Sequence, residues 1–224
     1  MTEQVIQPKF QFFSDFDGTI ALNDVGDGVF TTFAGPKWIE PVLEWKKGKI
    51  TSKECLTLEC ALTTVSRQEL ENFSDQQKID PYFEEFIGYC RQQNYPFIVL
   101  SDGLSFYIRR ILAKFGFHDI EVRANELIFL DNNKIRPEFP YYEKGCLVCG
   151  NCKGYHISKQ RQAATTSVYI GDGLSDRCGV HASDIVFAKD DLQKYCIDSG
   201  VDFYEFTNFK DVLEKFKKLE LEFV

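Results

Sequence analysis

The sequence predicts an α/β protein in which a Rossmann-like, mostly parallel sheet is flanked by helices. Three apolar runs, at residues 10–13, 97–100 and 167–170, have the length and composition of buried strands. Helix-like segments separate them, and each run ends directly in a polar, glycine-containing segment. Because open α/β sheets bind ligands at the carboxyl ends of their strands, the three polar segments are expected to meet at such a site.

The first polar segment is Asp15-Phe16-Asp17-Gly18-Thr19. Carboxylates that lie one residue apart on a strand point to the same side of the pleat. A close pair of acids in a partly buried cleft binds a hard cation such as Mg²⁺, shares a proton, or both. Gly18 allows a tight turn, and Thr19 adds a hydroxyl group. The alternative is a strand that ends in an acidic turn without a chemical role.

The segment between the first two strands, residues 22–79, is predicted to be helical. Thr51 with Glu54, and Ser66 with Glu69, have the spacing of capping boxes at two helix starts. The sequence therefore predicts a helical insertion after the first strand.

Strands and helices are expected to alternate after this insertion. In order, the pattern predicts a helix that begins at Asp80-Pro81, a helix over residues 104–115, a strand at 120–123, a hairpin over 127–139, an irregular segment at 141–151, a helix after Lys153, a strand at 185–188, a helix over 191–199, an edge strand at 203–204 and a final helix capped by Asn208.

Three further polar features accompany the second and third strands. Ser101-Asp102-Gly103 follows the second strand, Lys153 opens a helix, and Gly171-Asp172-Gly173-Leu174-Ser175-Asp176 follows the third strand. Each has a plain structural alternative: a capping serine, a surface lysine, and a helix cap with a solvated acid. Their shared position at strand ends and a helix start favours one common site.

This set of segments resembles the four motifs of the haloacid dehalogenase superfamily of phosphohydrolases. Asp15-x-Asp17-x-Thr19 resembles the first motif, Ser101 the second, Lys153 the third, and Gly171-Asp172-x-x-x-Asp176 the fourth. The resemblance covers Asp15 to Asp176, with the motifs in the family's order, and it implies the haloacid dehalogenase-like form of the α/β fold.

The resemblance implies a chemical role for each acid. Asp15 would be the nucleophile that forms an aspartyl phosphate, and Asp17 would be the general acid and base. Mg²⁺ would be held by Asp15, the backbone carbonyl of Asp17, and Asp172. Asp176 would be a supporting or alternate ligand. Asp17 favours phosphate chemistry, since the dehalogenases lack an acid at that position.

The resemblance also implies a phosphate-binding set. Ser101 would hydrogen-bond a phosphate oxygen, together with the backbone amides of Asp102 and Gly103. Lys153 would hold the phosphate as a point charge, and Lys159 is the rival for this role. Residues 1–21 and 80–224 would form the catalytic core, with a hairpin and cysteine-rich insertion at about 125–152, and residues 22–79 would form a helical cap that closes over the site and contributes to specificity.

Two phosphatase groups are close in appearance. Phosphoserine phosphatases share the expected architecture, and Asp24 lies near the position of their cap acid, but this chain has no arginine before Arg67 to bind a substrate carboxylate. The stretch Cys-Gly-Asn-Cys-Lys-Gly around Lys153 resembles phosphatases of methionine salvage that act on 2-hydroxy-3-keto-5-methylthiopentenyl-1-phosphate. Another small phosphate ester, and a phosphotransferase that uses an alcohol acceptor, stay open as alternatives.

Three cysteines, Cys146, Cys149 and Cys152, lie within seven residues. Thiolates at this spacing can hold Zn²⁺, with His156 or His118 as the fourth ligand. The alternative is a turn with free thiols, because no second CxxC pair completes a zinc motif. A thiol- or zinc-binding module on an inactive phosphatase fold is the more distant functional alternative. The remaining cysteines, which include Cys178, are predicted to be small core residues.

The composition limits the classes of partner that this protein is expected to bind. The net charge of −8 argues against a nucleic-acid surface, so we expect a small phosphorylated metabolite held by local positive groups. No apolar stretch approaches a membrane span, and no signal peptide is evident, so the expected location is the cytoplasm, with cysteines present as thiols. The expected assembly is a monomer or a homodimer.

Overall fold

The computed structural model describes residues 9–161 and 165–222, and a seven-stranded sheet forms its centre. The strand order is β4-β3-β2-β1-β5-β6-β7, and only the β3–β4 pair is antiparallel. The strands are β1 (Phe10–Ser14), β2 (Phe97–Leu104), β3 (Glu121–Phe129), β4 (Ile135–Glu138), β5 (Thr166–Gly171), β6 (Ile185–Ala188) and β7 (Tyr204–Glu205). The predicted α/β fold class is confirmed.

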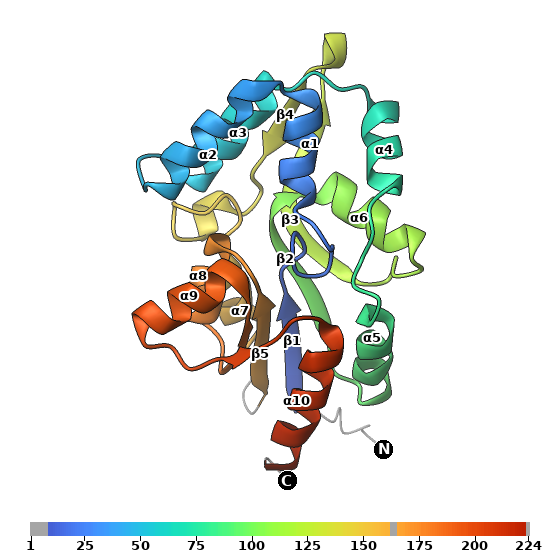
Figure 1. The fold of residues 1–224 in the computed structure, drawn as a ribbon, viewed down its shortest axis with the longest axis vertical. Coiled ribbons are helices and arrows are strands. Elements are labelled where there is room, and N and C mark those ends of the chain that lie inside the picture. Colours follow the sequence, from blue (N-terminus) through green and yellow to red (C-terminus); the bar gives the residue numbers. More distant parts are fainter. Residues whose placement is uncertain (1–8, 162–164, 223–224) are drawn as a thin grey trace, which may run out of the picture.

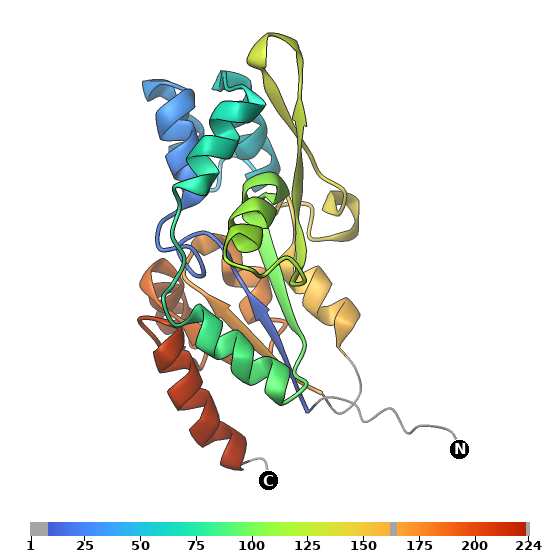
Figure 2. The same ribbon diagram turned by 90° about the vertical axis from the view of Figure 1, so that its right-hand side faces the viewer.

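The sheet is covered on both faces because alternate side chains of β1 enter two separate cores. Phe12 packs with residues of α5 (Phe83–Gln92), α6 (Ser105–Lys114) and α10 (Phe209–Glu222). Phe13 packs on the other face with residues of the remaining core helices. Those helices are α7 (Lys153–Gln160), α8 (Arg177–Val180) and α9 (Asp190–Ser199). Figure 2 shows α7 and α10 on opposite sides of the sheet.

Two elements extend further than the sequence pattern predicts. β2 continues through the second motif to Leu104, with a register shift against β3 between Leu100 and Leu104. β3 is one long strand that joins the expected core strand to the expected hairpin. The helix expected at Asp80-Pro81 begins at Phe83, and the Asp80 side chain accepts the backbone N–H of Tyr82 just before it.

Four helices lie beyond the carboxyl end of β1 and are called here the cap helices (Figure 1). They are α1 (Val25–Phe33), α2 (Ile39–Lys46), α3 (Ser52–Leu62) and α4 (Arg67–Asp75). Both predicted capping boxes are present, at the starts of α3 and α4. The β3–β4 hairpin rises beside these helices, where Val65 N–H donates to the carbonyl of Asn133 at 2.8 Å. The division into core and cap domains stays a prediction.

Within the described residues, no helix combines the length and the apolar character that crossing a membrane requires.

Candidate active site

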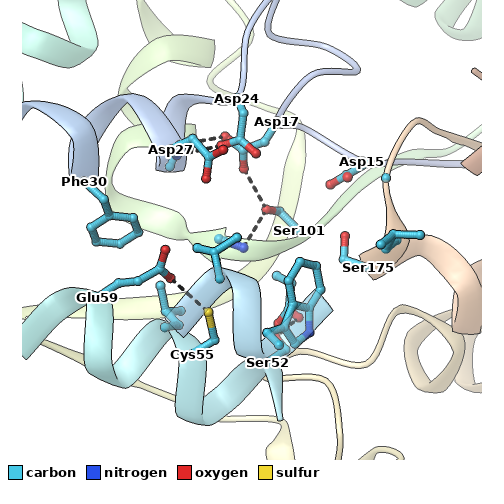
Figure 3. A pocket seen from close by; sticks show the side chains of 18 of the residues that line it. Asp15, Asp17, Asp24, Asp27, Phe30, Ser52, Cys55, Glu59, Ser101 and Ser175 are labelled. Carbon is cyan, nitrogen blue, oxygen red and sulfur yellow. Dashed lines mark hydrogen bonds between the residues drawn. The ribbon is translucent and has the colours of Figure 1, made fainter. Parts of the chain in front are cut away.

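A cavity of about 270 Å³ lies between the strand ends and the cap helices. Its floor contains Asp15, Asp17, Ser101 and Asp172, so residues of three predicted motifs meet in one place. The opposite wall comes from α1, α2 and α3. Figure 3 shows Asp15 and Ser175 at one side of this cavity and Glu59 at the other.

Asp15 follows β1 and is only 5% exposed. Its Oδ1 accepts the backbone N–H of Phe16 at 2.7 Å and pairs with Lys153 Nζ at 2.8 Å. Burial raises the pKa of Asp15 well above its usual range, helped by the charge of Asp176 and opposed by Lys153. Among the described residues, both of these contacts fall on Oδ1.

Asp17 turns away from this ion pair toward the cap. Its Oδ1 accepts the N–H of Val25, at the start of α1, at 3.1 Å. Its Oδ2 accepts the hydroxyl of Tyr107 at 3.0 Å and that of Ser101 at 3.3 Å. Burial, together with the nearby Asp24, raises the pKa of Asp17 to about 7 despite these hydrogen bonds. A carboxyl group with that pKa can both give and take a proton near neutral pH.

Asp172 and Asp176 follow β5, and their carboxylates cluster with that of Asp15. One oxygen from each of the three lies within 4.8 Å of the others. Thr19 donates to Asp172 at 2.5 Å, and Gly18 lies so close that a Cβ there would overlap the Asp172 carboxylate. Burial and the charge of Asp176 raise the pKa of Asp172 to about 7.

Asp176 differs from the other two acids in its hydrogen bonding, because its oxygens already accept from four donors. Oδ1 accepts from Lys153 Nζ and from the Tyr169 hydroxyl, and Oδ2 accepts the N–H groups of Asp172 and Gly173. It therefore fixes the loop that carries Asp172. An all-oxygen cluster of this kind suits Mg²⁺, with Asp15 and Asp172 as the accessible carboxylates.

Lys153 begins α7 and is completely buried between Asp15 and Asp176. Burial opposes its charge, but the two carboxylates overcome that cost and hold its pKa above the ordinary value. Lys159, the rival candidate, is exposed on the same helix. The lysine of the site is thus Lys153, which offsets part of the negative charge of three acids.

The second motif forms the irregular end of β2. Ser101 Oγ accepts the N–H of Gly103 at 2.9 Å, so this amide faces Ser101 in the structure. The side chain of Asp102 accepts the N–H of Asn151 at 2.6 Å and the hydroxyl of Ser52. Asp102 therefore joins β2 to the loop before α7 and to the cap, a role that the sequence did not predict.

The cap side of the cavity is partly acidic. Asp24 and Asp27 face Glu59 across the space (Figure 3). Burial, with the charge of Asp27, raises the pKa of Glu59 to about 8, and burial with the charge of Asp24 raises that of Asp27 to about 6. Phe30, Val42, Trp45 and Leu56 form an apolar part of the same wall, which Lys46 also lines. Sequence reasoning missed Asp27 and Glu59, because neither belongs to a motif.

The cysteine cluster lies beside the active site and has a composition that the sequence did not predict. Its fourth member is Cys178, whose thiol lies within 4.8 Å of those of Cys146, Cys149 and Cys152. The expectation of a histidine is wrong, and so is the assignment of Cys178 to the core. His156 contacts the Asn151 side chain at 2.6 Å instead, and neither it nor His118 joins the cluster.

Comparison with known proteins agrees with this geometry. A model of the haloacid dehalogenase-like hydrolase family matches residues 12–180. The 2-hydroxy-3-keto-5-methylthiopentenyl-1-phosphate phosphatase of Brevibacillus brevis is 29% identical over 96% of this chain and 99% of its own length. The enzyme of the same name from Bacillus mycoides is 30% identical over 94% of this chain and 97% of its own length.

Solved structures show the same fold. A phosphoserine phosphatase with an analogue of its phospho-aspartyl intermediate has a TM-score of 0.73 at 20% identity, covering 93% of this chain and 99% of its own. A substrate-bound phosphoserine phosphatase has a TM-score of 0.72, with the same identity and coverage. The family match runs from within β1 to the end of α8 and includes Asp15, Asp17, Asp102 and Asp172 of the cavity. This chain therefore belongs to the haloacid dehalogenase-like hydrolases.

Proposed function

We propose that this protein is a Mg²⁺-dependent phosphohydrolase that acts on a small phosphate monoester through an aspartyl phosphate at Asp15. The observation that carries the proposal is the buried arrangement around Asp15. Its Oδ1 is held by Lys153 and by the N–H of Phe16, and Asp172 and Asp176 lie beside it. Such an arrangement orients a carboxylate for attack on phosphorus.

In the first step, Asp15 Oδ2 forms a bond to phosphorus while the bond from phosphorus to the ester oxygen breaks. Asp17 gives its proton to that departing oxygen, which its pKa of about 7 allows. In the second step, Asp17 takes a proton from water, and the resulting hydroxide displaces Asp15 from phosphorus. Free phosphate leaves, and Asp15 returns to its starting state.

The positive groups of the site would offset the negative charge of the incoming phosphate. Lys153 neutralises part of the charge that builds up on the phosphoryl oxygens. When bound, Mg²⁺ supplies Lewis-acid stabilisation of those same oxygens. The residues that would hold it are Asp15, the backbone carbonyl of Asp17, and Asp172, with Asp176 supporting the loop.

The proposed substrate is 2-hydroxy-3-keto-5-methylthiopentenyl-1-phosphate, the compound named for relatives that match nearly the whole chain. The cavity supports this choice in two ways. Its apolar wall of Phe30, Val42, Trp45 and Leu56 suits a methylthio group. Glu59, with a pKa of about 8, is protonated at neutral pH and can donate a hydrogen bond to a keto oxygen.

Phosphoserine fits this cavity less well. Its carboxylate would need a cationic partner, and Lys46, the cation among the described residues that line the cavity, lies there with Asp24 and Asp27. The phosphoserine phosphatase structures support the fold rather than the substrate, because their identity to this chain is 20%. We place the enzyme in the cytoplasm, where its thiols stay reduced.

The test is phosphate release from the proposed substrate, O-phosphoserine and other small esters, with Mg²⁺ or with a chelator. We expect Mg²⁺-dependent release, fastest with the methylthio compound. Asp15→Asn should abolish it while leaving the circular dichroism spectrum unchanged. Release that persists in Asp15→Asn would refute the covalent mechanism, and a preference for O-phosphoserine would refute the proposed substrate.

A further inference from the structure

We propose that Cys146, Cys149, Cys152 and Cys178 bind one Zn²⁺ ion in a structural site separate from the active site. The first two thiols lie on the loop before α7, Cys152 immediately precedes α7, and Cys178 lies on α8. The site goes beyond the proposed phosphatase function and does not depend on it.

The spacing of the four sulfurs supports a single metal ion. The Sγ atoms of Cys149 and Cys178 are 3.9 Å apart, and those of Cys146 and Cys178 are 4.0 Å apart. A Zn–S distance of about 2.3 Å places sulfurs about 3.8 Å apart at the corners of a tetrahedron. A disulfide would instead require about 2.05 Å. These two separations are those of tetrahedral ligands and not of bonded sulfurs, and all four sulfurs lie within 4.8 Å of one another.

The backbone around the cluster is shaped for thiolates. Cys149 N–H donates to Cys146 Sγ at 3.4 Å, the type of bond that orients a sulfur and stabilises its negative charge. Gly154 lets α7 approach α8, because a Cβ there would lie 2.5 Å from the carbonyl oxygen of Cys178. The cysteine-bearing segments are thus held together by backbone contacts as well as by the proximity of the thiols.

The ligand set selects the metal. Four sulfurs with no carboxylate or imidazole favour soft or borderline cations over Mg²⁺, and a tetrahedral set of four cysteines is typical of structural zinc. Because all four positions are taken by protein, no site stays open for catalysis. The ion would join α7 to α8 and so support the pair formed by Lys153, next to Cys152, and Asp176, two residues before Cys178.

The experiment measures metal in the intact protein, purified under reducing conditions without chelator. We expect about one zinc per chain, with a sulfur-only shell at about 2.3 Å by X-ray absorption. Replacement by Co²⁺ should produce the thiolate-to-metal absorption of a tetrahedral site. Neither readout depends on phosphatase activity, so failure here is distinguishable from failure of the proposed function.

Two variants and a control make the assignment specific. Cys178→Ser should weaken zinc binding by more than about 100-fold, because loss of an outer partner alone typically costs 10- to 100-fold. The exposed Cys146→Ser should do the same and serves if Cys178→Ser does not fold. The control is Cys90→Ser, a buried cysteine of α5 outside the cluster, which should keep its zinc.

Several results would overturn the proposal. A folded wild-type protein without zinc would do so, as would a disulfide between any two of the four cysteines after reducing purification. Undiminished zinc in both cluster variants, or iron in place of zinc, would also exclude the assignment.

Discussion

Asp17 illustrates how its surroundings prepare one carboxyl group for proton transfer. Backbone N–H groups at the start of α1 hold Oδ1, while the hydroxyls of Tyr107 and Ser101 hold Oδ2. Burial nevertheless raises its pKa to about 7. The group is thus fixed in orientation without being locked into its charged form, which is what a residue that gives and then takes a proton needs.

Replacing Asp17 by Asn separates the two chemical steps. The amide can keep the contacts with Val25 and Tyr107, so the fold should survive. With p-nitrophenyl phosphate the departing group needs no proton, so the aspartyl phosphate should form and accumulate. Its hydrolysis should slow by about 10²- to 10⁴-fold. The measurement is labelled phosphate bound to the protein after quenching. Turnover at the wild-type rate would show that Asp17 is not the general base.

Glu59 should make stability depend on pH. Its pKa is raised to about 8 by burial and by Asp27 and Asp24, and Cys55 donates to it at 3.6 Å. Because the pKa of Glu59 is higher in the folded than in the unfolded protein, this group stabilises the fold fully below its unfolded-state pKa. The stabilisation is lost progressively as the pH rises from that value to about 8.

The variant Glu59→Gln tests this dependence because its amide does not ionise. Its melting temperature relative to wild type should rise between pH 5 and pH 9, by an amount that corresponds to at most a few kcal/mol. Glu40→Gln, at an exposed position of α2, is the control. A difference between Glu59→Gln and wild type that is the same at both pH values would refute the prediction.

The residues that belong to local motifs could be placed from the sequence. Asp15 and Asp172 follow strands, Ser101 follows the apolar first half of β2, and Lys153 opens a helix. Their positions could therefore be inferred before the structure. Glu59 and Cys178 could not, since each reaches its site only through contacts between distant segments. One feature of the sequence could have suggested the position of Cys178: it lies two residues after the fourth motif, and Cys152 lies next to the third.

Among the elements, the loop before α7 depends on one buried amide. Asn151 Nδ2 donates to the carbonyls of Ser101 and Arg123, at 2.9 and 2.8 Å. Its Oδ1 contacts His156 at 2.6 Å. This side chain therefore attaches the segment just before α7 to β2 and β3, and so helps to position Lys153.

Asn151→Ala should destabilise the protein by about 1–3 kcal/mol, because it leaves buried carbonyl groups without a donor. Urea unfolding measures the change. Asn72→Ala, at an exposed position of α4, should stay within about 0.5 kcal/mol of wild type. Equal effects from the two variants would mean that the buried contacts do not stabilise the loop.

Element boundaries were less predictable than element types. Polar residues in Ser101-Asp102-Gly103 suggested a turn, yet β2 continues through them, because β3 pairs again at Leu104 after a register shift. β3 likewise runs on past the core to form the hairpin. In both cases pairing with a neighbouring strand decides where the strand ends, and the local sequence does not contain that information.

For the whole molecule, stability should depend on the aromatic core on one face of the sheet. The ring of Phe216 on α10 lies 4.9 Å from that of Phe10 and 4.7 Å from that of Phe12. This contact fixes the last helix to the central strand. The buried residues of this helix recur at helical spacing, so that one face of it packs against the core.

Phe216→Ala should lower the free energy of unfolding by about 3–5 kcal/mol, through lost burial and the cavity it leaves. Chemical denaturation monitored by tyrosine and tryptophan fluorescence measures this. Leu221→Ala on the same helix is the matched control, because Leu221 is 75% exposed. If Phe216→Ala were as stable as Leu221→Ala, α10 would not be part of the cooperative core.

Ser52, at the start of α3, connects the cap helices to β2 and to the loop before α7. Its N–H donates to the carbonyl of Val148 at 3.0 Å, and its hydroxyl donates to Asp102. An outward swing of α3 would break the first bond and expose that amide to water. The exchange rate of the Ser52 amide hydrogen would then time the opening of the cavity. Hydrogen exchange at this single amide would therefore report how often the cavity opens.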